Sequence, residues 1–318
     1  MNKRSLGLII FLLLLASFLG GSLAAQIKYG KETGKPVAQA SPTQAPVPTQ
    51  PPFAPKTKSA KPEVKFFVMS FCPYGNQAEA GLEPVYQLLK DKVTWTPQYI
   101  ISDRKTSCEQ SCPYRVYNDQ AKSRCEAAVK NGQVKDVETC KGYFPYSSTE
   151  ECLQKECAGL KAGEYESLHG PQELNQDIRE IAAYNLSIES GSSVLGAKSG
   201  EGILSKWWKF ISLVNEKCNP NNADTCWKDQ AAAAGFDTAK ISQAAKTKKI
   251  DFIKQEIAQT TKYQVSSSPT VYINDTLYNG GRSAEDYKKA ICSAFENPPE
   301  ECNQILGQQS ATTSGGCN

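Results

Sequence analysis

The folded part of the chain opens with two apolar runs that flank an amphipathic segment. Residues 64–69 (Val-Lys-Phe-Phe-Val-Met) are short, apolar and rich in β-branched and aromatic side chains, which is typical of a buried strand. Residues 76–90 place apolar side chains at helical spacing and predict a helix, with a kink at Pro84. Residues 93–101 predict a second strand, so the N-terminal unit is expected to be βαβ.

The C-terminal part returns to β character. Residues 268–273 begin with Ser-Pro and continue as Thr-Val-Tyr-Ile, which predicts a strand. Asn274 and Asp275 supply a turn, and residues 276–278 can pair back as the second arm of a hairpin. Ser283 is placed to cap a last helix that runs to Phe295. This end of the domain is therefore predicted to be a ββα unit.

The region between these units is predominantly helical in pattern. The strongest helical spacing lies in residues 203–217, where apolar side chains recur every three to four positions. Residues 191–202 are rich in glycine and serine and predict a loop. Residues 105–170 have poor periodicity and six cysteines, which indicates short helices and loops joined by disulfides. Further helices are predicted at residues 172–184, 224–234, 237–245 and 249–263.

Together these patterns predict an α/β fold interrupted by a large insertion. The domain is expected to span residues 63–306, and its helical, Cys-rich insertion lies at about residues 105–262, between the βαβ and ββα units. Residues 307–318 are small and polar and predict a disordered tail.

The N-terminus indicates export. Lys3 and Arg4 precede an uncharged apolar stretch, residues 6–25, as in a secretory signal. A Ser-Leu-Ala sequence ending at Ala24 allows cleavage, but the stretch is also long enough for an uncleaved membrane anchor. Residues 1–25 are therefore predicted to be a signal peptide or a signal anchor. In either case we expect an extracytoplasmic protein, secreted or tethered to the membrane through residues 6–25.

A proline-rich linker is predicted to follow at residues 26–62. Its part from residue 36 onward holds eight of the 18 prolines of the chain, and the remaining residues are mostly Ala, Thr, Gln, Ser and Lys. Such a segment can bury almost no apolar surface, so it is expected to be extended rather than folded.

Composition narrows the chemistry. Residues 1–62 contain 8 of the 36 Lys and Arg residues but 1 of the 33 Asp and Glu residues, which leaves 28 basic and 32 acidic residues in the rest. A mildly acidic domain is not expected to bind nucleic acid.

The single histidine, His169, leaves little room for histidine metal sites or a Ser-His-Asp triad. All twelve cysteines lie at or after Cys72, which fits an oxidising compartment. No Cys-x-x-Cys pair is present, and no metal site is expected.

Cys72 is the leading candidate for a catalytic residue. It lies where a predicted strand turns into a helix, next to unpaired backbone N–H groups and the positive end of the helix dipole. Both features favour the thiolate, which is the form that takes part in thiol–disulfide exchange. Pro73 suits the first helical turn, Phe71 supplies an apolar shoulder, and Tyr74 is expected to shape the substrate surface. All three residues are expected to contact the substrate.

Three stretches resemble known families. Residues 71–75 (Phe-Cys-Pro-Tyr-Gly) after a strand, followed by a long insertion and then residues 268–270 (Ser-Pro-Thr), resemble thioredoxin-like proteins of the DsbA class. Residues 169–175 (His-Gly-Pro-Gln-Glu-Leu-Asn) resemble a signature of the gamma-interferon-inducible lysosomal thiol reductase family. Residues 207–302 resemble the luminal domain of plant vacuolar sorting receptors.

The DsbA-class resemblance implies a thioredoxin-like fold and a role for Ser268 and Pro269. In that fold a cis proline faces the cysteine at the helix start, and the backbone beside it pairs with a bound peptide. Ser268 and Pro269 are therefore expected to bind the substrate opposite Cys72.

The chain also departs from these families. Gly75 occupies the position of the second cysteine in the usual Cys-x-x-Cys motif, so Cys72 cannot form a disulfide within the helix. Leu168 and Leu174 replace cysteines that flank the lysosomal signature. A mixed disulfide at Cys72 would then be resolved by a partner thiol, a small thiol or a distant cysteine, for which Cys317 in the tail is a candidate.

The other cysteines have structural interpretations. Cys218 and Cys226 are close enough in sequence to close a loop between helices, and Cys292 and Cys302 to clip the last helix to the following turn. The six cysteines between residues 108 and 157 could form three disulfides within the insertion. That leaves Cys72 and Cys317, and a structural disulfide at Cys72, with Cys317 or with a cysteine of the insertion, stays open.

Two functions follow as hypotheses. The first is an extracytoplasmic thiol–disulfide oxidoreductase or isomerase-like protein that acts on protein or peptide thiols through Cys72 alone, without a cofactor. The alternative is a non-catalytic, peptide-binding thioredoxin-like ectodomain. The first requires Cys72 to be solvent-accessible and unpaired at rest.

Overall fold

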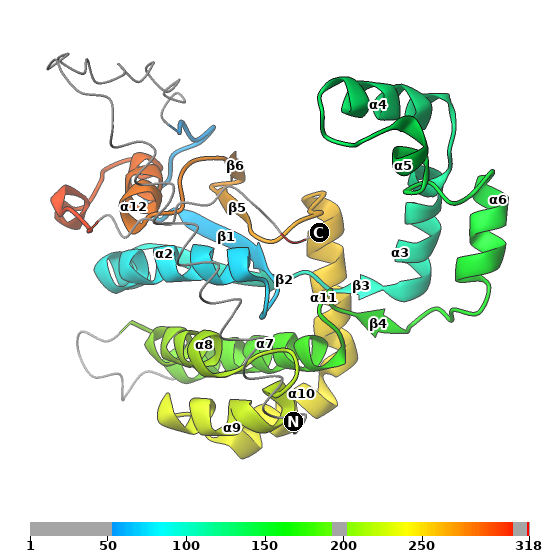
Figure 1. The fold of residues 1–318 in the computed structure, drawn as a ribbon. Coiled ribbons are helices and arrows are strands. Elements are labelled where there is room, and N and C mark those ends of the chain that lie inside the picture. The colour runs from blue at the N-terminus through cyan, green and yellow to red at the C-terminus, as the bar shows by residue number, and fades with distance from the viewer. Residues whose placement is uncertain (1–52, 193–201, 308–316, 318) are drawn as a thin grey trace, which may run out of the picture. The chain divides into compact units, whose positions relative to one another are not determined.

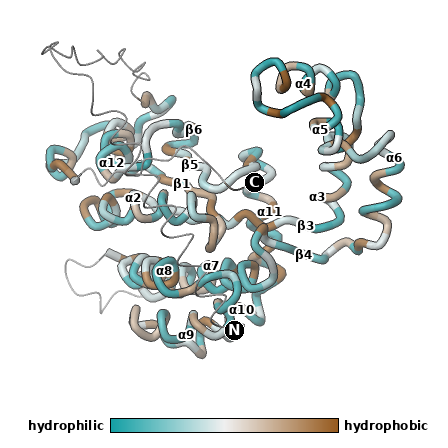
Figure 2. The backbone as a smooth tube through the Cα atoms, in the orientation of Figure 1, coloured by the Kyte–Doolittle hydropathy of each residue, from teal (hydrophilic) through white to brown (hydrophobic). Residues whose placement is uncertain are grey.

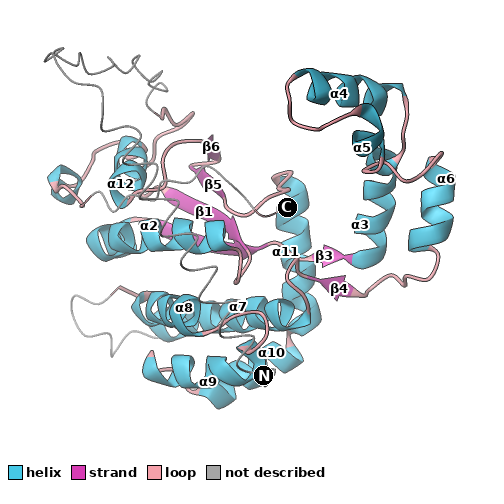
Figure 3. Cartoon of the chain, in the orientation of Figure 1, coloured by secondary structure: helices cyan, strands magenta, loops and turns pink. Residues whose placement is uncertain are grey.

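The computed structural model describes residues 53–192, 202–307 and 317, all within the unit Gln50–Asn318. Its main sheet has four strands in the order β2-β1-β5-β6 (Figures 1 and 3). Strand β1 pairs in parallel with β2 and antiparallel with β5, and β6 continues antiparallel from β5. The strands are β1 (Glu63–Val68), β2 (Thr94–Tyr99), β5 (Thr270–Ile273) and β6 (Thr276–Tyr278).

Two helices complete the predicted end units. Helix α2 (Pro73–Leu89) connects β1 to β2, which gives the βαβ unit, and α12 (Ala284–Ser293) follows the β5–β6 hairpin, which gives the ββα unit. Ser283 caps α12, because its side chain accepts a hydrogen bond from the backbone N–H of Asp286. The two helices pack against each other. The predicted α/β architecture is therefore confirmed.

The residues between the two units form two separate parts. In the first, a two-stranded sheet connects to short helices: β3 (Ser102–Asp103), α3 (Arg104–Ser111), α4 (Asp119–Lys130), α5 (Val137–Lys141), α6 (Thr149–Cys152) and β4 (Tyr165–Glu166). In the second, longer helices follow: α7 (Pro171–Ser192), α8 (Ser205–Lys217), α9 (Ala223–Ala233), α10 (Thr238–Thr247) and α11 (Lys249–Lys262). Helix α7 continues beyond the predicted end at residue 184, because Leu186 still packs on the core.

The two parts are stabilised in different ways. The first has a small core of Cys112, Val116, Tyr146, Cys152 and Cys157, and its helices are mostly hydrophilic (Figure 2). Because so little apolar surface is available, disulfides carry much of its stability. The helices of the second part belong to the main core, which continues from the sheet through α2 and α7 to α11.

An aromatic cluster joins the sheet to the helices. The ring of Phe66 on β1 stacks on Trp208 of α8 with 5.6 Å between ring centroids, and Trp207 beside it is also fully buried. Tyr86 of α2 and Trp95 of β2 pack edge to face at 5.8 Å and both contact Trp208. The strong helical pattern of residues 203–217 is thus the face that α8 turns toward the sheet.

The predictions for residues 1–25, for most of the linker and for most of the tail at 307–318 fall outside the described residues, as does most of the loop predicted at 191–202. None of the helices in residues 53–192 and 202–307 combines the length and the hydrophobicity that a membrane span requires.

Candidate functional site

The chain places Cys72 at the start of α2. Cys72 is the N-cap residue, and its Sγ accepts a hydrogen bond from the backbone N–H of Gly75 at 3.4 Å. Pro73 occupies the first helical position, where its missing N–H costs nothing. The backbone N–H of Cys72 donates to the Met69 carbonyl at 3.1 Å, which closes the turn between β1 and α2. The helix N-terminus thus provides the setting in which a thiolate is stabilised.

The loop before β5 faces this cysteine. The Ser268–Pro269 peptide bond is cis, as the DsbA-class resemblance implies. The carbonyl oxygen of Ser268 lies 3.5 Å from Cys72 Sγ. The side chain of Ser268, which is fully buried, accepts a hydrogen bond from the Met69 N–H at 3.2 Å. The structure therefore brings residues 72 and 268 together, although they are 196 positions apart.

The expectation that Cys72 is unpaired and accessible is wrong. Cys72 forms a disulfide with Cys317, with 6.0 Å between their Cα atoms, and it is fully buried, whereas Cys317 is partly exposed. Two backbone hydrogen bonds accompany the disulfide: Ser268 N–H donates to the Cys317 carbonyl at 2.7 Å, and Cys317 N–H donates to the Ser268 carbonyl at 2.8 Å. Residue 317 therefore lies antiparallel to residue 268 in an isolated bridge.

The other residues predicted around Cys72 occupy different environments. Phe71 is buried in the main core, so its side chain does not offer a substrate the apolar shoulder that the sequence predicts. Pro73 is exposed, and Tyr74 and Pro269 are partly exposed. The Tyr74 ring lies 6.0 Å from the guanidinium carbon of Arg282. Three of the predicted substrate-binding side chains are thus open to solvent to some degree, whereas Phe71 and Ser268 are not.

Gly75 and Ser268 fill the space that a second cysteine would need. A Cβ atom at position 75 would lie 2.7 Å from Ser268 Oγ and 3.5 Å from Cys72 Cβ. Since Ser268 Oγ is held by the Met69 N–H, it cannot move away freely. The loop that carries Ser268 therefore leaves no room for a cysteine side chain at position 75.

Replacing Gly75 with Ala is expected to destabilise the protein by about 1–3 kcal/mol through overpacking, instead of the gain of up to about 1 kcal/mol that Gly→Ala gives in an open helix. Chemical denaturation measures the change. The S268A variant, which also loses the Met69 hydrogen bond, serves as the second arm of a double-mutant cycle. We expect the variant with both substitutions to lose less unfolding free energy than the two single losses added together. Losses that simply add would contradict the steric explanation.

Two acidic residues of α7 hold the turn that carries Cys72. Asp177 accepts hydrogen bonds from the N–H of Ser70 at 3.0 Å and from its hydroxyl at 2.6 Å. Glu173 accepts from the N–H of Phe71 at 2.9 Å. Both carboxyl groups are fully buried, and each fixes a backbone position just before the cysteine. They position the turn and do not touch the sulfur.

Glu173 also explains the place of the single histidine. His169 N–H donates to Glu173 Oε2 at 2.7 Å, and His169 Nδ1 lies 2.8 Å from Glu173 Oε1. The Ser167 hydroxyl donates to Glu173 Oε2 at 3.0 Å. The His-Gly-Pro-Gln-Glu stretch therefore supports the Cys72 turn through its glutamate.

Further buried carboxyl groups line the contact between α2 and the helices that cover it. Burial raises the pKa of Glu79 to about 8, against a hydrogen bond from Asn215 that lowers it. Burial, with the nearby charge of Glu79, raises the pKa of Glu180 to about 8. Burial also raises the pKa of Asp177 well above its usual range, assisted by the charge of Glu173. These carboxyl groups favour the protonated form at neutral pH.

Sequence reasoning missed the role of these acidic residues, although Glu173 lies in the 169–175 stretch that resembles the lysosomal reductase signature. Glu173, Asp177 and Glu180 follow one another at helical spacing, a pattern that normally marks a solvated helix face. One signal in the sequence was usable. Apolar residues occur on more than one side of helix α7, which indicates that other elements cover part of its polar face as well.

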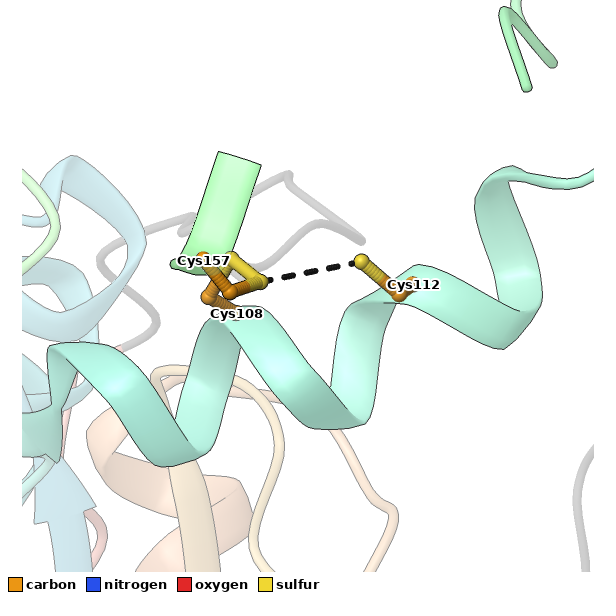
Figure 4. Close-up of side chains that lie close together, drawn as sticks. All are labelled: Cys108, Cys112 and Cys157. Carbon is orange, nitrogen blue, oxygen red and sulfur yellow. Dashed lines mark hydrogen bonds between the residues drawn. A yellow bond between two sulfur atoms is a disulfide. The ribbon is translucent and has the colours of Figure 1, made fainter. Parts of the chain in front are cut away.

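Three cysteines of the insertion come close enough to suggest a metal site. The sulfur atoms of Cys108, Cys112 and Cys157 lie within 4.8 Å of one another (Figure 4). Cys108 is bonded to Cys157, and Cys112 to Cys152, and the two disulfides are in contact, with 3.7 Å between Cys112 Sγ and Cys157 Sγ. Disulfide sulfurs do not act as thiolate ligands, so the oxidised cluster is not suited to a metal ion.

The remaining cysteines are also paired. Cys125 and Cys140 form the third disulfide of the insertion. Disulfides also connect Cys218 with Cys226 and Cys292 with Cys302, as the sequence spacing suggested. All twelve cysteines are therefore paired, and only the Cys72–Cys317 disulfide has a partner from the last residues of the chain.

Sequence comparisons relate part of the chain to known proteins. A protein-family model described as thioredoxin matches residues 191–292. Vacuolar-sorting receptor 1 of Pisum sativum is 23% identical over 202 residues, and vacuolar-sorting receptor 4 of Arabidopsis thaliana is 22% identical over 205 residues. Each match covers 55% of this chain, and the chain spans 30% of the length of either receptor.

Structure comparisons add bacterial disulfide oxidoreductases. Reduced DsbG of Mycobacterium tuberculosis is similar over 79% of this chain and 89% of its own, with 12% identity and a TM-score of 0.39. Oxidised DsbA of the same organism matches over 79% and 91%, with 13% identity and a TM-score of 0.40. A probable DsbA oxidoreductase from Streptomyces coelicolor matches over 81% and 98%, with 13% identity and a TM-score of 0.39.

The cis proline and strands β5 and β6 lie within residues 191–292, the part of the chain that the thioredoxin family model matches, whereas Cys72, β1 and β2 lie outside it. The chain has a thioredoxin-like α/β fold with a helical insertion.

Proposed function

We propose that this protein is an extracytoplasmic thiol–disulfide oxidoreductase or isomerase-like enzyme that exchanges disulfides with protein or peptide thiols through Cys72. The buried Cys72–Cys317 disulfide is then its oxidised resting form, in place of the unpaired, accessible thiol that the sequence predicts. One observation carries the proposal: Cys72 Sγ caps a helix N-terminus and lies 3.5 Å from the backbone of Ser268 at the cis proline. The helix start stabilises the thiolate as a nucleophile and as a leaving group. The facing backbone can align a second sulfur against it.

Substrate alignment is assigned to the backbone of Ser268. Its N–H and carbonyl groups both form hydrogen bonds with the backbone of residue 317, whose sulfur is bonded to Cys72. An extended peptide with a cysteine at that position would use the same two hydrogen bonds. The partly exposed Pro269 and Tyr74 would contact the residues beside that cysteine.

The pairing of all twelve cysteines supports an extracytoplasmic location. Disulfides of this number persist where thiols are not kept reduced. Export through residues 1–25, and a membrane tether through residues 6–25, belong to the same proposal.

A peptide-binding module without catalysis is the second candidate. It is favoured by the complete burial of Cys72 and by Gly75 in place of a second cysteine. The names of the curated relatives, which are sorting receptors, point the same way. In this case Ser268 would bind an extended peptide, and the disulfide would be structural.

Covalent trapping separates the two functions. The protein is treated with a dithiol under native conditions, freed of it, and mixed with a peptide disulfide. We expect mass spectrometry to locate a mixed disulfide at Cys72, and the C72S variant to form no adduct at that position. A double variant lacking the Cys218–Cys226 disulfide controls for the loss of a disulfide as such. Equal binding of the peptide and of its serine analogue, without an adduct, would support the binding module and contradict the enzyme.

A further inference from the structure

We propose that Cys317 is the second cysteine of the redox pair, and that it resolves mixed disulfides at Cys72 by taking the position of the substrate beside Ser268. This inference rests on the proposed function and adds to it the partner that a Cys-x-x-Cys motif would otherwise provide. The relevant distinction is between a disulfide that only holds the chain together and one that exchanges during turnover.

The bonding around Cys317 is that of a bound peptide. Its sulfur is joined to Cys72, and its backbone N–H and carbonyl groups bond the carbonyl and N–H of Ser268 at 2.8 and 2.7 Å. The bridge is antiparallel and involves the residue that precedes the cis proline. Three bonds therefore fix a single residue at the site where a substrate cysteine is expected.

Substrate and Cys317 exclude each other at this site. Cys72 Sγ forms one disulfide at a time, and the Ser268 N–H has one hydrogen to donate, which is directed to Cys317. A substrate that forms a mixed disulfide at Cys72 must therefore displace Cys317. Because Cys317 belongs to the same chain, its return is an intramolecular step that does not depend on protein concentration.

No other cysteine of the chain is placed for this role. The position of a second cysteine in α2 is taken by Gly75 and closed by Ser268 Oγ, 2.7 Å from where its Cβ would lie. The other ten cysteines form five disulfides among themselves, with 8 to 49 positions between partners. Cys72 and Cys317 are 245 positions apart, yet they are the pair that meets at the cis proline.

The exchange balances without a cofactor. In the reducing direction, the Cys72 thiolate attacks one sulfur of a substrate disulfide, and the other substrate sulfur leaves as a thiolate and takes up a proton. The Cys317 thiolate then attacks Cys72 Sγ, and the second substrate sulfur leaves. The substrate disulfide gains two electrons and becomes two thiols, while two thiols of the protein become the Cys72–Cys317 disulfide. The oxidising direction consists of the same steps reversed.

Regeneration uses an external thiol such as glutathione. Cys317 is the partly exposed residue of the pair and Cys72 the buried one, so we expect an incoming thiolate to attack Cys317 Sγ, and Cys72 to leave as the thiolate that the Gly75 N–H stabilises. A second glutathione thiolate then releases Cys317 and yields glutathione disulfide. Two thiols are oxidised for each protein disulfide that is reduced.

Glutathione buffers of different total concentration test this assignment. An intramolecular pair is oxidised by one glutathione disulfide with release of two glutathiones, whereas a lone thiol forms an adduct with release of one. At a fixed ratio of the two forms, diluting both by about tenfold should raise the oxidised-to-reduced ratio of the wild type by about tenfold, and should leave the adduct ratio of the C317S variant unchanged. Acid quenching, alkylation and mass mapping give both ratios.

The outcomes distinguish this inference from the proposed function. A wild type that accumulates a Cys72–glutathione adduct as C317S does, with no dependence on dilution, would overturn the role of Cys317 and leave Cys72 as a lone nucleophile. A C317S variant that forms no adduct, together with a wild-type disulfide that is reduced only on unfolding, would overturn both. The variant lacking the Cys292–Cys302 disulfide is the matched control, and its Cys72–Cys317 pair should respond to dilution as the wild type does.

Discussion

Replacing Glu173 with Ala lowers the free energy of unfolding by about 3 kcal/mol or more. Its carboxylate accepts hydrogen bonds from Phe71 N–H, from His169 N–H and from the Ser167 hydroxyl, and it is fully buried. Removal leaves several buried donors without partners, and each unsatisfied group costs about 1–3 kcal/mol. Denaturant unfolding of the oxidised protein measures the loss.

Two variants make this measurement specific. Glu189 lies on the same helix with an exposed side chain, and E189A should change stability by less than about 1 kcal/mol. E173Q keeps a carbonyl oxygen and should recover part of the loss. An E173A variant as stable as E189A would contradict the positioning role. We also expect E173A to slow adduct formation at Cys72, because the turn before the cysteine loses its support at Phe71.

Stability falls as pH rises from about 5 to about 8. Burial raises the pKa of Glu256 to about 8, against the Tyr99 N–H, which lowers it by donating to the carboxyl group at 2.8 Å. The folded state therefore keeps its proton between the unfolded pKa of about 4.5 and the folded pKa of about 8, where the unfolded state has lost it. The contribution is complete below pH 4.5 and is lost as pH rises through 8. One such group is worth on the order of 5 kcal/mol over this interval.

The E256Q variant isolates this effect. A glutamine keeps an oxygen for the Tyr99 N–H but does not titrate, so E256Q should match the wild type near pH 5 and exceed its stability by several kcal/mol near pH 8.5. Unfolding curves at both pH values give the difference. Glu79 and Glu180, whose pKa values are also raised to about 8, leave a residual pH slope in the variant. An unchanged slope in E256Q would show that Glu256 is ionised in the folded protein at neutral pH.

The sequence predicted those features that local patterns determine. Strand, turn and helix around Cys72 follow from adjacent residues, as do the β5–β6 hairpin and the Ser283 cap of α12. Cysteines 8 or 10 positions apart could be paired by proximity alone. The α/β fold class could be predicted because the βαβ and ββα units are each recognisable from patterns among neighbouring residues.

Long-range contacts were beyond such reasoning. The sequence leaves the Cys72–Cys317 disulfide open only by counting the remaining cysteines, because Cys317 lies in a polar tail 245 positions away where no periodicity indicates a contact. Glu173 and Asp177 bond the turn over 102 and 107 positions, and they resemble solvated helix residues until another element covers them. What sequence reasoning got wrong, the free and accessible state of Cys72, depended on one of these contacts.

The two hydrophobic cores in the described part of the chain differ in what keeps them folded. The core around the sheet consists mainly of aliphatic and aromatic side chains, whereas three of the five buried residues in the small core between β3 and β4 are half-cystines. The part of the protein around the main sheet is thus held together mainly by its own apolar side chains. Helices α3 to α6, which surround the small core, stay folded only where their disulfides stay oxidised. Their stability therefore depends on the redox conditions around the protein as well as on the sequence.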